Sequence, residues 1–255
     1  MVTVERRYCA IIEYDGTDFL GYQIQAKGRT VQGEIEQSLK AVTQSTVRIN
    51  GAGRTDAGVH ATGQVIAFDV AWRHTRLDLQ RALNATLPSD IVISSLRTVD
   101  PNFHPRYSAI SRTYQYTVVN QECRPVLQRR YAHYVREPLN VVAMNQAGKC
   151  LVGTFDFASF GKPPTGSVTI RNVTQALWTV NHQQFMFEIT ANAFLYRMVR
   201  KLVGTLIQVG LGQLSVGEIQ EILEARDLRR SAPPVPARGL SLVRVTYPKD
   251  VWGTP

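Results

Sequence analysis

Apolar residues recur at two spacings along the chain, and these spacings predict strands in some segments and helices in others. The segment 8–14, YCAIIEY, is rich in aromatic and β-branched residues and is followed by Asp15-Gly16, as expected for a strand that ends in a turn. In the segment 31–42, apolar residues return every three or four positions, which predicts an amphipathic helix with one buried face. Thr30 is well suited to cap the N-terminus of this helix.

The same patterns continue through both halves of the chain. The first half adds a strand that ends near Asn50, a strand over 64–70, a helix carrying Leu79, Leu83 and Leu87, and a strand over 91–99. The second half adds a strand over 108–120, a helix over 141–151, strands over 170–180 and 185–190, a helix over 193–209, a helix with a Ser215–Glu218 capping box, and a strand over 240–247. The basic, proline-punctuated stretch 121–138 is expected to form a crossover or a long loop. This order predicts an α+β protein of two sheet-and-helix lobes.

The charge of the chain favours a phosphate-rich partner. Its 255 residues suffice for one large or two small domains, and 29 Lys and Arg against 20 Asp and Glu give a formal net charge of +9. A surplus of this size is typical of proteins that bind nucleic acid, although it could serve solubility alone.

The cysteines and histidines argue against disulfide and metal sites. Cys9, Cys123 and Cys150 form no CxxC pair, and the five histidines show no HExxH spacing. The N-terminal segment lacks the features of a signal peptide, and no segment is long and apolar enough to span a bilayer. We therefore expect a cytoplasmic protein with no metal site.

A glycine-rich loop, GAGRTDAGVHA at 51–61, lies between two predicted strands. It does not match the dinucleotide fingerprint, because its third glycine comes too late and a strand follows in place of a helix. It is not an NTPase phosphate loop either, because Val59 and His60 stand where Lys and Ser or Thr are needed. Arg54 and Asp56 could present a guanidinium and a carboxylate to a ligand, or could form only an ion-paired turn.

The loop resembles the signature of the tRNA pseudouridine synthase A family, in which the aspartate of GRTDxGVHA is catalytic. The resemblance continues, in the family's order, through YDGT and GYQIQ, LNATLP, FHPRYSA with SRTYQY, ANAFLYRMVRKLVG, and the final AP and GLSL. It implies two RRM-like or ferredoxin-like lobes that form a continuous, mainly antiparallel sheet flanked by helices, with a central RNA-binding cleft. The N-terminal lobe, 1–105, would carry the aspartate loop, and the C-terminal lobe, 106–255, an active-site tyrosine and arginine.

The implied activity is the isomerisation of uridine to pseudouridine at positions 38, 39 and 40 of the tRNA anticodon stem-loop, by a homodimer without a cofactor. This reaction breaks the N1–C1′ bond and forms a C5–C1′ bond, so it needs a nucleophile or electrostatic partner, a proton acceptor and a held uracil. Asp56 could attack C6 of the base, attack C1′ of the sugar, or support a glycal pathway. Two alternatives stay open: a non-catalytic tRNA-binding or folding module, and a pseudouridine synthase that acts at other RNA sites.

Tyr114 and Arg200 complete the catalytic set that the resemblance implies. Tyr114 matches the family's active-site tyrosine, whose ring can stack on the extruded base while its hydroxyl lies near the proton to be moved. Arg200 matches the family's basic residue, which would pair with Asp56 and keep it ionised. Without the resemblance, Tyr114 would be interpreted as a core aromatic, and the basic side of the 193–209 helix as a solvated face.

Further residues are candidate RNA contacts. Arg54 would fill the space left by the flipped base or hold an adjacent phosphate. His60 would contact RNA or serve as a hydrogen-bonded structural histidine. The other candidates, for contacts with the RNA backbone or base, are His104, Arg106, Arg124, Arg129, Arg130, Arg197 and Lys201.

Two positions depart from the family's pattern. Phe155 stands where the family often has a histidine in a GTHDF-like segment, so no role of that histidine can be transferred. Pro105 occupies the third position of FHPR, where alanine is expected, and removes a backbone donor.

Overall fold

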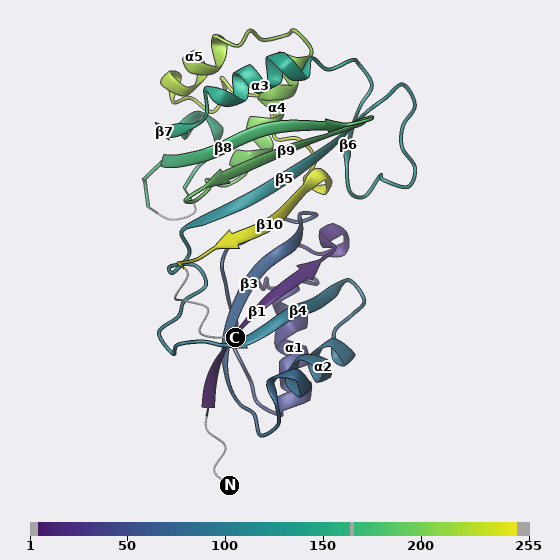
Figure 1. Cartoon of the computed structure of the whole chain (residues 1–255), viewed down its shortest axis with the longest axis vertical. Helices are drawn as coiled ribbons and strands as arrows, with labels where there is room; N and C mark the ends of the chain where they lie inside the picture. The colour runs from purple at the N-terminus through teal and green to yellow at the C-terminus, as the bar shows by residue number, and fades with distance from the viewer. Residues whose placement is uncertain (1–4, 164–165, 249–255) are drawn as a thin grey trace. The chain divides into compact units, whose positions relative to one another are not determined.

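The computed structural model describes residues 5–163 and 166–248, which separate into two compact units. Of the described residues, the first unit holds 5–110 and 242–248, and the second holds 111–241. Each unit combines strands with helices (Figure 1). The sequence-based boundaries give the C-terminal strand to the second lobe, whereas most of that strand belongs to the first unit. A β-carbon on Gly63 would lie 2.2 Å from the Val243 carbonyl oxygen, so this strand runs close along the backbone at Gly63.

The strands of the first unit surround the glycine-rich loop. They are β1 (Glu5–Tyr14), β2 (Asn50–Gly51), β3 (His60–Ala71), β4 (Ile91–Thr98) and β10 (Leu240–Thr246). Their order is β4-β1-β3-β10; β1 is antiparallel to both β3 and β4, and β2 pairs with β3. The strand predicted to end near Asn50 ends at Gly51 and has only two residues, because the chain first pairs with β3 at Asn50.

The helices of the first unit follow the predicted pattern. They are α1 (Val31–Thr43) and α2 (Arg76–Thr86), with a short 3₁₀ helix, η1 (Gly16–Asp18), after β1. The cap at Thr30 is confirmed, since its side chain accepts a hydrogen bond from the Gly33 N–H. Ile35 and Leu39 on α1 are fully buried, as the apolar spacing predicts.

The second unit has its own mainly antiparallel strands. They are β5 (Ser111–Asn120), β6 (His133–Val135), β7 (Gly153–Asp156), β8 (Ile170–Asn181) and β9 (Gln184–Ala191). The order is β5-β9-β8-β7, with antiparallel neighbours, while β6 pairs with β5 in parallel. The sequence patterns did not predict β6 or β7, because strands of 3 and 4 residues are too short to show an alternation.

The helices of the second unit pack against its strands and against one another. They are α3 (Val141–Lys149), α4 (Met198–Gly210) and α5 (Glu218–Ala225), with the 3₁₀ helices η2 (Ala158–Phe160) and η3 (Ala237–Gly239). The Ser215–Glu218 capping box is confirmed by reciprocal hydrogen bonds of 2.7 and 3.4 Å. The helix predicted to start at Ala193 starts instead at Met198, because Arg197 has a left-handed backbone with φ of 61°.

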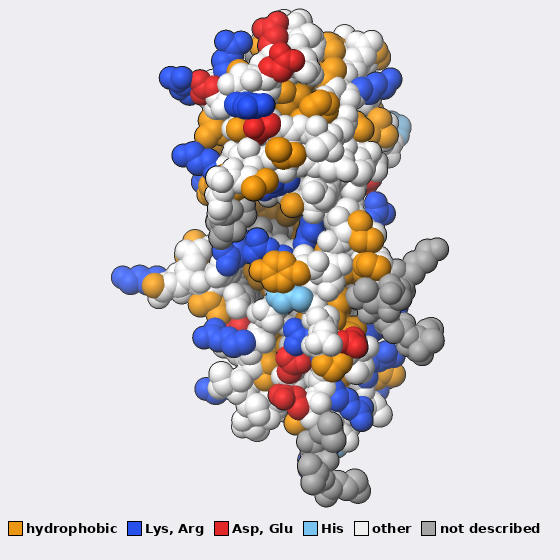
Figure 2. All heavy atoms as spheres, turned by 90° about the vertical axis from the view of Figure 1, so that its left-hand side faces the viewer, with side chains coloured by type: hydrophobic (Ala, Val, Ile, Leu, Met, Phe, Trp, Pro, Cys, Tyr) orange, Lys and Arg blue, Asp and Glu red, His pale blue; other side chains and the backbone are white. Residues whose placement is uncertain are grey.

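The α+β class with mainly antiparallel strands and flanking helices is confirmed. In the part of the chain that the structure describes, no helix is long and apolar enough to cross a membrane. Figure 2 shows Lys and Arg side chains on the surface of each unit, with Asp and Glu among them. The RNA-binding cleft and the homodimer stay predictions.

Candidate active site

The loop between β2 and β3 in the first unit holds Arg54 and Asp56. Arg54 is exposed and Asp56 is partly buried. Among the described residues, the Arg54 side chain makes no hydrogen bond or ion pair, so the alternative of an ion-paired turn between Arg54 and Asp56 is wrong. The guanidinium therefore projects from the loop without being neutralised by the carboxylate two residues later.

The backbone around Asp56 is fixed by neighbouring turns. The Tyr22 N–H donates to the Thr55 carbonyl oxygen at 3.1 Å, and the Val59 N–H donates to the Asp56 carbonyl oxygen at 3.2 Å. Gly21 has a φ of 101°, and a β-carbon there would lie 3.0 Å from the Thr55 carbonyl oxygen. The segment after β1 therefore lies directly against the residues that precede and follow the carboxylate.

His60 closes the loop onto η1. It is 8% exposed, its Nδ1 accepts a hydrogen bond from the Gly16 N–H at 3.0 Å, and the same atom lies 3.1 Å from an Asp15 carboxylate oxygen. These contacts are those of a structural histidine. An RNA contact by His60 stays a prediction.

Gly16 allows this approach because it has no side chain. A β-carbon on Gly16 would lie 2.0 Å from the Val59 carbonyl oxygen, which is backbone and cannot rotate away. We expect Gly16→Ala to lower the free energy of unfolding by about 1–3 kcal/mol through overpacking. Urea unfolding measures the change.

Gly217→Ala is the matched control for Gly16→Ala. Gly217 has helical dihedral angles (φ −64°, ψ −34°), and the nearest heavy atom to an added β-carbon is 4.0 Å away. This substitution should be neutral or slightly stabilising. Equal losses in the two variants would contradict the role given to Gly16.

Tyr114 occupies a partly exposed position on β5 in the second unit. It pairs with Ile189 of β9, and its ring meets Phe194 edge to face, with centroids 5.1 Å apart and an interplanar angle of 89°. Tyr116, two residues on, is fully buried, and its hydroxyl donates to the Pro236 carbonyl oxygen at 2.8 Å. Tyr116, and not Tyr114, is therefore the fully buried core tyrosine of this strand.

Arg200 is partly buried on the first turn of α4. Its Nε donates to the Val235 carbonyl oxygen at 2.7 Å, and its own carbonyl oxygen accepts from the Val235 N–H at 3.2 Å. The guanidinium is therefore held on one edge by the proline-rich connector. A fixed arginine of this kind can present its remaining N–H groups in a defined direction.

The basic side of α4 is not the solvated face that its charges alone would indicate. Lys201 donates from Nζ to the carbonyl oxygens of Leu228 and Ala232 at 3.2 and 3.0 Å, and burial lowers the pKa of Lys201. Gly204 is buried, and a β-carbon there would lie 2.7 Å from the Pro233 carbonyl oxygen. The connector thus packs on this side of the helix and gives Lys201 structural partners, so an RNA contact by Lys201 stays only a prediction.

The remaining candidates lie at exposed or partly exposed positions. Arg197 is exposed, and its guanidinium lies 4.8 Å from the centroid of the Tyr196 ring. Arg106 is partly exposed, while the Nδ1 of His104 accepts from the Arg106 N–H at 3.1 Å, and burial lowers the pKa of His104. His104 therefore shapes the turn that carries Arg106. The other candidates, Arg124, Arg129 and Arg130, are exposed between β5 and β6.

The two positions that depart from the family's pattern have structural contacts. The ring of Phe155 packs near Phe157, with centroids 6.4 Å apart, and crowds Gly153, where a β-carbon would lie 2.8 Å from it. The Pro105 carbonyl oxygen accepts a hydrogen bond from the Tyr247 hydroxyl at 2.7 Å. Both residues therefore contribute to packing within their own units.

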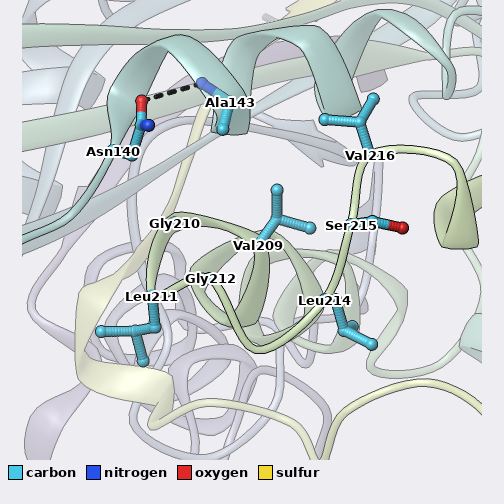
Figure 3. Close-up of a pocket in the computed structure, with 9 residues that line it drawn as sticks. All are labelled: Asn140, Ala143, Val209, Gly210, Leu211, Gly212, Leu214, Ser215 and Val216. Carbon is cyan, nitrogen blue, oxygen red and sulfur yellow. Dashed lines mark hydrogen bonds between the residues drawn. The ribbon is translucent and has the colours of Figure 1, made fainter.

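A pocket of about 430 Å³ in the second unit contains none of these candidates (Figure 3). It lies between the start of α3 and the end of α4, and its lining is largely apolar. The Asn140 Oδ1 accepts from the Ala143 N–H at 3.1 Å, so this polar side chain caps α3. No group of three His, Cys, Asp or Glu side chains among the described residues could hold a metal ion.

Sequence reasoning missed the residues that hold the aspartate loop in place. Tyr14, Gly21 and Gln64 contact the loop from β1, the turn after η1 and β3. The one available signal was Gln64, a polar residue directly before the apolar run 65–68.

Comparison with known proteins gives matches along nearly the whole chain. The sequence profile of a family described as tRNA pseudouridine synthase matches residues 10–108 and 147–248. The tRNA pseudouridine synthase A of Brevibacillus brevis is 41% identical over 246 residues, which cover 95% of this chain and 100% of that protein. The enzymes of the same name from Geobacillus kaustophilus (42% identical; 95% of this chain, 95% of that protein) and Chloroflexus aurantiacus (43%; 98% and 92%) are similar over comparable lengths.

Proposed function

Because this chain belongs to the tRNA pseudouridine synthase family, we propose that it isomerises uridine to pseudouridine in tRNA, with Asp56 as the catalytic carboxylate. The observation that carries the proposal is how the loop 51–61 holds and exposes Asp56. Its backbone is fixed on both sides of Asp56, while Asp56 is partly accessible and not paired with Arg54. A carboxylate held in this way suits attack on, or electrostatic stabilisation of, a bound nucleoside.

The chemistry rearranges one nucleoside without a net change in its atoms. The N1–C1′ bond breaks, the uracil turns, C5 bonds to C1′, the proton on C5 leaves and N1 gains a proton. An ionised Asp56 can act by attack on C6, by attack on C1′, or by stabilising a glycal intermediate. All three routes need the carboxylate close to the ribose and base, because reacting atoms must be about 3–3.5 Å apart.

Tyr114 and Arg200 are the other residues to which we give catalytic roles. Tyr114 is partly exposed on β5, and its ring packs against Phe194 at a right angle. A tyrosine of this kind can stack on an extruded base and bring its hydroxyl to the proton that moves. The Arg200 guanidinium, fixed through Val235, would stabilise negative charge in the active site.

Exposed arginines bind the RNA backbone in this proposal. We expect the combined substitution of Arg124 and Arg129 by Ala to weaken tRNA binding and to reduce the dependence of log Kd on log salt concentration by about 1 for each phosphate that the protein no longer neutralises. Filter binding at several salt concentrations measures this slope.

Arg48→Ala is the control for the arginine substitutions. Arg48 is also exposed, but it is paired at 3.0 Å with Glu36 of α1. Arg48→Ala should leave the slope of log Kd against log salt concentration unchanged. The same decrease in slope for Arg48→Ala and the double variant would contradict a specific role for the 121–138 stretch.

The substrate site is the finer part of the proposal. We expect pseudouridine at positions 38, 39 and 40 of the anticodon stem-loop when unmodified tRNA is incubated with the protein and modified positions are mapped. Pseudouridine at other positions would support a different site specificity. Tight binding with no pseudouridine at any position would support the non-catalytic module.

We also propose that the protein acts as a homodimer, as the family resemblance implies. Light scattering should then give twice the chain mass of 28.5 kDa. A mass of one chain at the concentrations used for activity would contradict the dimer.

A further inference from the structure

A buried polar cluster joins the loop of Arg54 and Asp56 to the ends of β1 and β3. Its members are Tyr14, Thr55 and Gln64, which are 3%, 7% and 0% exposed. The Tyr14 hydroxyl lies 2.8 Å from the Thr55 hydroxyl, and the Gln64 Nε2 donates to the Gly53 carbonyl oxygen at 2.8 Å. Burial raises the pKa of Tyr14 to about 12, although its hydrogen bonds with Thr55 and Gln64 lower the pKa, so the hydroxyl keeps its proton at neutral pH.

An irregularity in strand pairing brings these side chains together. Ile12 of β1 pairs with Gln64, but Tyr14 pairs with Ala61, so β3 has one residue more than β1 between the two pairs. A bulge of this kind bends a strand and redirects its side chains. Here it lies where β1 ends and β3 begins, next to the loop.

The cluster holds alternate residues of the loop. Gly53 is fixed through its carbonyl oxygen and Thr55 through its hydroxyl, and Arg54 and Asp56 are the residues that follow them. The Thr55 carbonyl oxygen is held in addition by the Tyr22 N–H. The backbone is thus fixed on both sides of Arg54 and directly before Asp56.

A polar cluster at this place is not required for packing. Gln64 is followed on β3 by Val65, Ile66, Ala67 and Phe68, all buried, and an apolar side chain at 64 would continue that core. Buried hydrogen-bonded groups often add little net stability compared with apolar residues of similar size, but they define one geometry. The cluster is therefore better explained by the precision of the loop than by the stability of the unit.

We propose that Tyr14 and Gln64 are positioning residues, which act through Thr55 and Gly53 to hold Asp56 in its reactive place. This inference rests on the proposed catalytic role of Asp56.

Two buried tyrosines next to the loop make a matched test. Tyr22 is 4% exposed, and its hydroxyl has no hydrogen-bond partner among the described residues, whereas the Tyr14 hydroxyl is bonded to the loop. Tyr14→Phe should lower kcat about 10- to 100-fold with little change in KM for tRNA, the loss expected when a catalytic group is misplaced by a fraction of an ångström to 1 Å. Tyr22→Phe keeps the ring and the backbone and should retain native kcat.

A second pair of variants keeps the inference testable if Tyr14→Phe folds poorly. Thr55→Val removes the hydroxyl at nearly constant volume and should lower kcat, whereas Thr55→Ser retains the hydroxyl and should restore most of it. Equal kcat for Tyr14→Phe and Tyr22→Phe, or equal loss for Thr55→Val and Thr55→Ser, would overturn the positioning role.

Asp56→Asn separates this inference from the function on which it rests. If Asp56→Asn keeps native kcat, the catalytic role of Asp56, on which this inference rests, is wrong. If Asp56→Asn is inactive while folded Tyr14→Phe and Thr55→Val have native kcat, only the positioning role is wrong.

Discussion

Asp56→Asn is expected to lower the rate of pseudouridine formation by at least about 10⁴-fold, because an amide can neither attack the nucleoside nor stabilise positive charge as a carboxylate does. The substitution preserves the shape of the side chain, and the loop is held by the hydrogen bonds of Thr55 and of the Asp56 carbonyl oxygen, which do not involve the carboxylate. Binding of tRNA should therefore change little. Chromatography of nucleosides from digested tRNA measures the product, and filter binding measures the affinity.

Asp69→Asn is the control for the loss of one negative charge. Asp69 lies near the other end of β3, is paired with Arg7 and is 46% exposed at its side chain. Asp69→Asn should retain the native rate of pseudouridine formation. An active Asp56→Asn would show that another group supplies the chemistry, and an Asp56→Asn protein that no longer binds tRNA would assign the residue to binding.

Tyr114→Phe is expected to lower kcat about 10²- to 10⁴-fold, the range by which a positioned proton-transfer group contributes to rate. The phenyl ring keeps the edge contact with Phe194 and can still stack on a base, so KM for tRNA should change much less than kcat. The loss should appear in single-turnover rates, where product release does not contribute.

Tyr116→Phe, on the same strand, should lower the stability of the protein and leave kcat unchanged. It leaves the part-buried Pro236 carbonyl oxygen without its donor, which should cost about 0.5–1.5 kcal/mol of unfolding free energy while the folded protein stays active. Native kcat in Tyr114→Phe, or a loss of stability like that of Tyr116→Phe, would show that Tyr114 serves in packing and not in catalysis.

Local patterns predicted the elements whose own residues determine them. The helix over Val31–Thr43 has its cap at Thr30 and its apolar spacing in one continuous segment, and both are observed. The start of α4 was placed too early because nothing in the apolar spacing indicates the left-handed backbone of Arg197. β6 and β7 were missed because their pairing comes from neighbours distant in sequence.

The residues of the candidate site could likewise be predicted only where a continuous motif contains them. Asp56 could be chosen from the sequence because its loop is a continuous motif, and the resemblance added Tyr114 and Arg200. The burial of Lys201 under the connector and the attachment of the loop to Tyr14 depend on contacts between residues 27 to 41 positions apart. Contacts of this range follow from tertiary packing, which a single sequence does not display.

The central claim is that this protein moves the glycosidic bond of uridine from N1 to C5 in tRNA. The most direct measurement is release of tritium from tRNA that carries uridine labelled at C5, because C5 loses its proton once it bonds to C1′. We predict release with multiple turnovers by the native protein and without an added cofactor. No release from any tRNA by folded protein that binds tRNA would contradict the claim.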